Sequence, residues 1–161
     1  IDDHTAVFIE PLAAAFRITE QVDLNPGVTL AILGDGKLGL LCAWVARLTG
    51  AHVHLVGKHQ AKLALAGDGV MTHTIDEARQ MGRMFDVVVD CTGSTSGFPL
   101  ALELVEPCGT VVLKTTVAGD YALNLASVVI DEVSLYFRGP DGERLELLAD
   151  PLGEMYGSPV I

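Results

Sequence analysis

The stretch VTLAILGDGKLGLL, residues 28–41, decides the fold of this chain. An apolar run that suits a buried strand stops at Gly34, and an apolar run that suits a helix starts after Gly36. A third glycine, Gly39, lies within the expected helix. Glycine is unfavourable inside strands and helices, so three of them here indicate a turn where backbone must come unusually close to another group.

The three glycines form the pattern G-x-G-x-x-G between an expected strand and an expected helix, which is the context of a dinucleotide fingerprint. Gly34 then allows the tight turn, Gly36 lets a pyrophosphate approach, and Gly39 lets the helix pack on the strand. The backbone around Lys37 and Leu38 opens the helix, where exposed N–H groups and the helix dipole favour phosphate. An ordinary turn with incidental glycines is the alternative.

The rest of the chain alternates between strand and helix patterns. Expected strands cover 28–34, 51–57, about 70–74, 85–90, 110–116 and 132–137, and expected helices cover 5–21, 37–49, 58–66, about 97–106 and 143–149. Strands that are apolar on both faces and alternate with helices predict a parallel sheet covered on both sides. We therefore expect a single α/β domain over residues 1–161, a doubly wound six-stranded Rossmann sheet in the order 3-2-1-4-5-6.

The end of the second strand predicts which dinucleotide binds. An acidic residue here would bind the ribose 2′-hydroxyl of NAD, but the sequence places Gly57 at this point. Lys58 and His59 follow, and Lys62 lies one turn further on. Cations in place of the acid favour the 2′-phosphate of NADP over NAD. Alternatively, these three side chains are ordinary solvated residues at a helix start, and NAD remains the other cofactor.

Composition excludes several partners. Ten basic against twenty-one acidic residues give a formal net charge of −11, which argues against nucleic-acid binding. No apolar run is long enough to predict a membrane span. The three cysteines are Cys42, Cys91 and Cys108; they form no CxxC pair, so we expect a reducing, cytoplasmic setting without disulfides or a structural zinc lobe.

Four stretches resemble the coenzyme-binding domain of the medium-chain dehydrogenase/reductase superfamily, on its zinc-dependent alcohol, polyol and threonine dehydrogenase side. They are EPLAAAF at 10–16, LGDGKLGLL at 33–41, DVVVDCTGS at 86–94 and ALELVEPCGTVVL at 101–113. The resemblance implies a longer parent enzyme that transfers hydride between NADP and an alcohol or carbonyl substrate at a zinc ion. It also implies that this chain is an excised coenzyme domain, without its barrel-like catalytic domain and inactive alone.

The resemblance assigns further site residues. Glu10 matches a glutamate that can approach or ligate the catalytic zinc, whose other ligands belong to the catalytic domain; zinc is therefore expected only in the full-length parent. Cys91, Thr92 and Gly93 match the loop beside the nicotinamide ribose, with Cys91 as a lining residue. Thr115 and Thr116 match the strand end that offers backbone groups to the carboxamide. The alternatives are a first-turn acid for Glu10 and plain polar strand ends for the others.

Two other functions remain open. One is a zinc-free quinone or enoyl-type reductase of the same superfamily, against which the EPL stretch argues. The other is a non-catalytic nucleotide-sensing module, which would share the glycine turn. A short-chain dehydrogenase is not favoured, because none of Tyr121, Tyr136 and Tyr156 is followed by lysine at the required spacing.

Strand 132–137 is expected to be the last in the sheet. An exposed apolar edge strand invites pairing, and in the resembling family two such edges meet across a twofold axis. The sequence therefore predicts a homodimer through this strand. Alternatively, the segment after Arg138 folds back and covers the edge within one chain.

Overall fold

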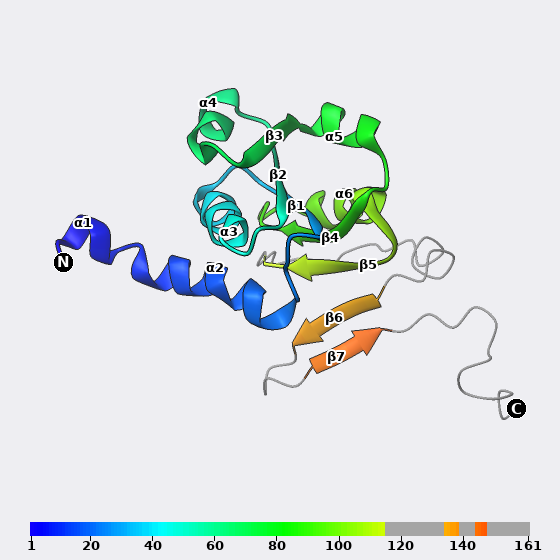
Figure 1. The fold of residues 1–161 in the computed structure, drawn as a ribbon, viewed down its shortest axis with the longest axis horizontal. Coiled ribbons are helices and arrows are strands. Elements are labelled where there is room, and N and C mark those ends of the chain that lie inside the picture. The colour runs from blue at the N-terminus through cyan, green and yellow to red at the C-terminus, as the bar shows by residue number, and fades with distance from the viewer. Residues whose placement is uncertain (115–133, 139–143, 148–161) are drawn as a thin grey trace, which may run out of the picture.

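A twisted sheet with helices on both faces forms the body of the molecule (Figure 1). The computed structural model describes residues 1–114, 134–138 and 144–147. No helix in these ranges is both long and apolar enough to cross a membrane.

Six strands of the sheet run parallel in the predicted order. The sheet order is β3-β2-β1-β4-β5-β6-β7, in which the first six are parallel and β7 is antiparallel to β6. The strands are β1 (Thr29–Leu33), β2 (His52–Gly57), β3 (Val70–Thr74), β4 (Phe85–Asp90), β5 (Val105–Leu113), β6 (Ser134–Arg138) and β7 (Arg144–Leu147). The expected doubly wound Rossmann sheet is thus confirmed.

The far edge of the sheet differs from the prediction. The sequence pattern predicts a helix over 143–149, but β7 occupies Arg144–Leu147 and pairs with β6 from Leu135↔Leu147 to Arg138↔Arg144. The period-two alternation RLEL suits a strand, and the segment is too short for a stable helix. The strand predicted over 132–137 is therefore not the last one in the sheet, which is a correction to the sequence analysis. Its outer edge is paired with β7 over residues 144–147, and the homodimer stays a prediction. The alternative, in which the following segment covers this edge, holds for residues 144–147.

The helices follow most of the sequence pattern. They are α1 (Asp3–Ala6), α2 (Ile9–Gln21), α3 (Lys37–Arg47), α4 (Gln60–Leu63) with the short 3₁₀ turn η1 (Ala64–Ala66), α5 (Ile75–Met81) and α6 (Gly97–Leu104). The expected helix 5–21 is split: α1 ends at Ala6, and α2 starts at Ile9 with Pro11 in its first turn. Proline fits the first turn of a helix but not the interior of a longer one. The additional helix α5 begins at a capping box, in which the Thr74 and Glu77 side chains satisfy each other's backbone N–H groups.

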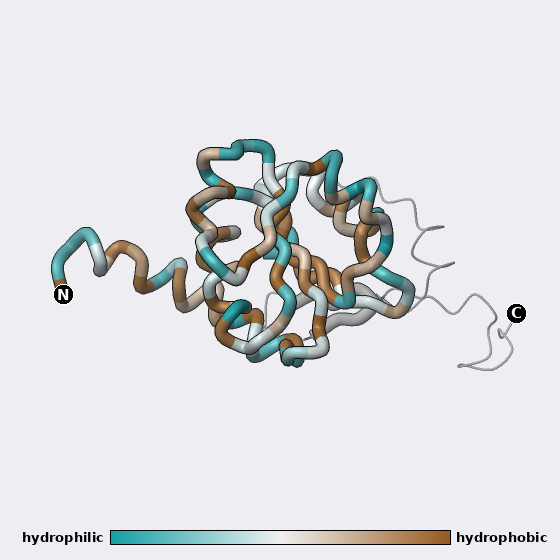
Figure 2. Tube along the Cα trace, turned by 45° about the horizontal axis from the view of Figure 1, so that its top comes forward, coloured by the Kyte–Doolittle hydropathy of each residue, from teal (hydrophilic) through white to brown (hydrophobic). Residues whose placement is uncertain are grey.

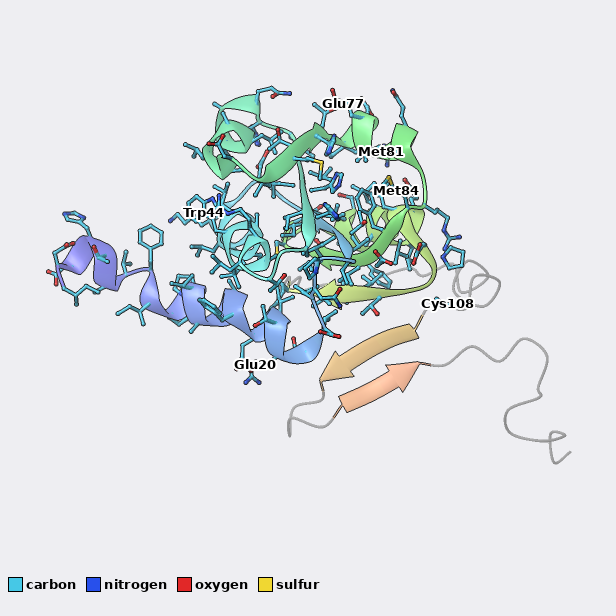
Figure 3. All side chains as sticks on the ribbon, in the orientation of Figure 1. Glu20, Trp44, Glu77, Met81, Met84 and Cys108 are labelled. Atoms are coloured by element: carbon cyan, nitrogen blue, oxygen red, sulfur yellow. The ribbon has the colours of Figure 1, made fainter. Side chains whose placement is uncertain are left out.

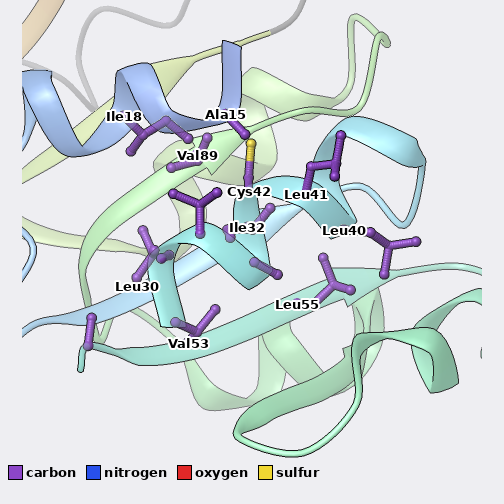
Figure 4. Close-up of a cluster of buried hydrophobic side chains, with 14 of the residues drawn as sticks. Ala15, Ile18, Leu30, Ile32, Leu40, Leu41, Cys42, Val53, Leu55 and Val89 are labelled. Carbon is purple, nitrogen blue, oxygen red and sulfur yellow. The ribbon is translucent and has the colours of Figure 1, made fainter. Parts of the chain in front are cut away.

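Alternate residues of the central strands supply two hydrophobic cores. Leu30 and Ile32 of β1 belong to the cluster beneath α2 and α3, which also contains Ile18 (Figure 4). Ala31 and Leu33 point the other way, into the cluster on the α5 and α6 side. Burial on both faces explains why these strands are continuously apolar, and Figure 2 shows the same concentration of hydrophobic residues at the centre.

Polar contacts tie the outer elements to α3. The Trp44 side chain, labelled in Figure 3, donates from Nε1 to the carbonyl of Ala66 at 2.9 Å. The guanidinium of Arg47 donates to the carbonyl of Asp68. These contacts hold the α4–η1 segment beside α3, and so help to position the loop that follows β2.

A buried histidine lies on the face of the sheet that α5 and α6 cover. His54 of β2 stacks on His73 of β3, with Nδ1 of the first 2.9 Å from Nε2 of the second, and its ring meets the edge of Phe85. Burial, followed by the charges of His73 and His52, lowers the pKa of His54 from 6.5 to about 4. The native state therefore holds this ring neutral at pH values where the unfolded chain protonates it.

We predict that His54 makes the fold sensitive to mild acid. Its pKa is lowered on folding, so stability is lost as pH falls through 6.5 towards 4, by up to about 3 kcal/mol. The variant His54→Leu should lose less stability than the wild type between pH 7 and pH 4.5, as measured by urea unfolding. His4→Leu, at an exposed histidine of α1, serves as control and should keep the wild-type pH dependence. Equal pH dependence in all three proteins would contradict the assignment.

Candidate functional site

The glycine turn lies between the carboxyl ends of β2 and β4. Gly34 has a positive φ of 111°, and its N–H donates to the carbonyl of Val56 at 2.8 Å. On the other side, the N–H of Cys91 donates to the carbonyl of Leu33 at 2.9 Å. A Cβ on residue 34 would lie 2.9 Å from the carbonyl oxygen of Cys91. Only glycine therefore fits this turn without strain.

The other two glycines of the motif have opposite surroundings. A Cβ on Gly39 would run into the carbonyl oxygen of Gly34, so the absence of a side chain lets α3 pack on the turn. A Cβ on Gly36 would meet nothing within 4 Å. Packing inside the protein thus explains Gly39 but does not explain Gly36, which lies open where a ligand could approach.

The start of α3 can bind an anion. Gly36 is its N-cap residue and has extended backbone, and no side chain caps the helix. The first-turn N–H groups of a helix have no partner within it, and the helix dipole makes this end positive. Lys37 is exposed and Leu38 is half-buried at this end of the helix.

The end of β2 brings together the predicted cations and one acid that the sequence reasoning missed. Gly57 is buried at the end of the strand, while Lys58, His59 and Lys62 are exposed. Between them lies the carboxylate of Asp35, which comes from the glycine turn and is only 8% exposed. The motif leaves this position unconstrained, so no sequence signal marked it.

Asp35 bridges the glycine turn and the loop after β2. Its Oδ2 accepts hydrogen bonds from the backbone N–H groups of Lys58 at 2.7 Å and His59 at 2.6 Å. The His59 ring nitrogen Nδ1 lies 3.0 Å from the same oxygen, and Lys62 Nζ lies 3.9 Å from Oδ1. Burial by itself raises the pKa of the Asp35 carboxyl, but the hydrogen bonds from His59 and Lys58 outweigh it and lower the pKa.

The loop after β4 is the third group at the carboxyl ends of the central strands. Asp90 ends this strand fully buried, and its Oδ1 accepts from the Thr92 N–H at 2.8 Å and from the Thr92 hydroxyl at 2.7 Å. Its Oδ2 is buried without a hydrogen-bond partner, facing the start of α6 at Gly97. Gly93 follows with a φ of 64° and open space where a Cβ would be. Asp90 thus shapes the predicted loop, a role that the sequence reasoning did not assign.

The Cys91 thiol is hydrogen-bonded within the protein. Its Sγ lies 3.8 Å from Sγ of Cys42 on α3 and donates a hydrogen bond to it. This hydrogen bond and burial raise the pKa of the Cys91 thiol well above its usual value. Cys91 is therefore a protonated thiol, whereas a nucleophilic cysteine needs its pKa lowered.

The remaining predicted residues are Thr115, Thr116 and Glu10. Thr115 and Thr116 lie outside the described residues. Glu10 is exposed in the first turn of α2, and across residues 1–114 no group of three potential metal ligands comes together. A zinc ion would therefore need ligands other than those that this part of the chain brings together.

Three predicted groups thus meet along the carboxyl ends of β1, β2 and β4. They are the open glycine turn, the cationic end of β2 and the Thr92–Gly93 loop. At this end of the sheet β1 has β2 on one side and β4 on the other, so the three groups lie at the switch point of the strand order. Such an edge can hold an extended, negatively charged ligand, with phosphates on α3 and a ribose beside β2.

We predict contrasting effects at two glycines of the motif. Gly39→Ala should lower the free energy of unfolding by about 2 kcal/mol or more, because the new methyl group meets the Gly34 carbonyl. Gly36→Ala should stay folded with a small change in stability, since nothing surrounds its Cβ, but should weaken dinucleotide binding. Urea unfolding and fluorescence titration with NADPH measure both properties. Unchanged binding by Gly36→Ala would show that the ligand does not approach this turn.

Relatives with known names resemble the chain over most of its length. It is 28% identical over 122 residues to D-xylulose reductase A of Aspergillus oryzae, a match that covers 66% of this chain and 34% of the relative. The chain thus spans about a third of the length of the curated relatives that it matches.

Solved structures share the fold. A Sinorhizobium meliloti protein classed as a zinc-binding dehydrogenase and bound to NADP superimposes with a TM-score of 0.72 at 25% identity, covering 80% of this chain and 42% of that one. Alcohol dehydrogenase from Thermus sp. ATN1 superimposes with a TM-score of 0.69 at 24% identity, covering 77% and 39%. The zinc-binding dehydrogenase family model matches residues 38–141, which is more than half of the chain. The glycine turn, the doubly wound sheet and this match together show that the chain belongs to the zinc-binding dehydrogenase family.

Proposed function

We propose that this chain is the coenzyme-binding part of a NADP(H)-dependent dehydrogenase of the alcohol and polyol type. The observation that carries the proposal is the open Gly36 at the start of α3, in a turn whose other two glycines are fixed by packing. The NADP bound to the Sinorhizobium meliloti relative supports a nicotinamide dinucleotide as the ligand. The reaction is hydride transfer between the nicotinamide and an alcohol or carbonyl substrate.

Each part of the edge has a role in holding the cofactor. The start of α3 binds the pyrophosphate through its N–H groups and dipole. The Thr92–Gly93 loop, braced by Asp90, lies on the nicotinamide side of the glycine turn, with Cys91 as a neutral wall. These groups bind and orient the cofactor, while the hydride chemistry belongs to the nicotinamide itself.

Substrate binding is assigned to the rest of a longer protein. A zinc ion there would polarise the substrate oxygen, and Glu10 is the residue of this chain proposed to approach it. The exposed apolar side chains of α2 and the turn before it, including Phe8, Ile9 and Phe16, suit a covering domain. We therefore expect the chain alone to bind cofactor without oxidising alcohols. The family match favours this zinc-type function over a zinc-free quinone or enoyl reductase.

The preference for NADP(H) rests on charge at the end of β2. Lys58, His59 and Lys62 are exposed around a strand end that carries no acid of its own. A 2′-phosphate can accept charge-assisted hydrogen bonds from them, which NAD lacks. Asp35, the carboxylate beside them, accepts hydrogen bonds from two backbone N–H groups at its Oδ2.

We predict that Lys58→Ala weakens NADPH binding about tenfold and leaves NADH binding within about twofold. Fluorescence titration of the purified chain with each reduced cofactor measures both affinities. Arg17→Ala, which removes one positive charge from an exposed ion pair on α2, is the matched control and should change neither. Tighter binding of NADH than NADPH by the wild type would refute the preference. Failure to bind either cofactor would refute the proposed function.

A further inference from the structure

The carboxylate of Asp35 lies where the usual acid of a dinucleotide site would be. A Cβ on Gly57 would lie 2.5 Å from the Asp35 Cβ and 2.6 Å from its Oδ2. The space of a side chain at the end of β2 is thus already filled by a carboxylate. It comes from the glycine turn, 22 positions earlier than the residue whose place it takes. An acid cannot be added at residue 57 unless Asp35 moves.

The same carboxylate also contacts two of the side chains assigned to the 2′-phosphate, those of His59 and Lys62. His59 Nδ1 lies 3.1 Å from Oδ1, and Lys62 Nζ lies 3.9 Å from that oxygen. The His59 and Lys62 side chains are 58% and 50% exposed, so a ligand can reach them. A phosphate on this site would therefore compete with Asp35 for the same two side chains.

We propose that Asp35 is a specificity-determining residue of the dinucleotide site. Its carboxylate repels the 2′-phosphate of NADP(H) and competes with it for Lys62 and His59, while the 2′-hydroxyl of NAD(H) meets no such opposition. Asp35 thereby keeps the preference for NADP(H) small, and the site accepts both cofactors. This inference rests on the proposed function, since it concerns the choice between two ligands of that site.

Asp35 also has a structural role, and the choice of variant separates the two. An asparagine side chain at this position would be nearly isosteric, and its carbonyl oxygen could still accept the N–H groups of Lys58 and His59. The substitution Asp35→Asn therefore removes the charge but keeps the bridge between the glycine turn and the β2–α4 loop. Asp35→Ala removes both, so it should loosen the loop and weaken both cofactors together.

The test is the ratio of the NADH and NADPH dissociation constants of the purified chain, measured by fluorescence titration at low and high salt. Asp35→Asn should bind NADPH about fivefold more tightly at low salt and leave NADH within about twofold. The gain should shrink at high salt, because it is electrostatic. Asp23→Asn is the charge-matched control. This exposed acid precedes β1, at the amino ends of the strands and away from the site, so the variant should keep the wild-type ratio.

The outcomes separate the two proposals. An unchanged ratio in folded Asp35→Asn, with wild type binding NADPH, would mean that Asp35 is only a structural bridge, and the proposed function would stand. Weaker NADPH binding by this variant would also overturn the inference, because the carboxylate would then assist the phosphate. No binding of either cofactor by the wild type would refute the proposed function and this inference with it. Circular dichroism and thermal unfolding establish that each variant is folded.

Discussion

The contact between α3 and the glycine turn is the constraint on which the rest of the site depends. A Cβ at residue 39 would run into the carbonyl of Gly34, so the helix reaches the turn only because that Cβ is missing. This approach fixes where α3 begins relative to the sheet, and hence where its unpaired N–H groups point. The N–H of Gly34 donates to β2, and the carbonyl of Leu33 accepts from the N–H of Cys91 in the loop after β4. One close approach thus sets the positions of all three parts of the candidate site.

The charged groups at the end of β2 come together in the folded chain although they are not neighbours in the sequence. A pattern search looks for an acid at the end of the second strand and finds Gly57. In the folded chain a carboxylate occupies that place, but it belongs to Asp35 in the glycine turn. It satisfies two backbone N–H groups and lies beside the exposed side chains of His59 and Lys62. The electrostatic potential at the end of β2 is therefore set by groups from two loops, and neither loop predicts it alone.

The sequence carries local signals for several elements. Signals from long elements predict structure better than signals from short ones. The capping box of Thr74 and Glu77 followed by Gly82 is a readable start and stop for α5, and the sequence reasoning passed over it. The RLEL alternation of β7 carries strand character, but only its pairing with β6 makes a four-residue segment regular. Short elements are decided by partners that lie elsewhere in the chain, whereas long buried strands carry their own hydrophobic pattern.

The sequence by itself determined the doubly wound sheet, its strand order and the glycine turn. Apolar runs, helix periodicity and backbone-specific glycines are local properties, and right-handed crossovers leave few ways to assemble them. The predicted cations at 58, 59 and 62 also followed from position along the chain. Only the tertiary structure decided that Asp35 fills the side-chain space of Gly57, that Cys91 hydrogen-bonds to Cys42, and that β7 covers β6. Each of these is a contact between segments distant in sequence or a pairing choice among competing partners, and such contacts depend on three-dimensional packing that no local pattern encodes.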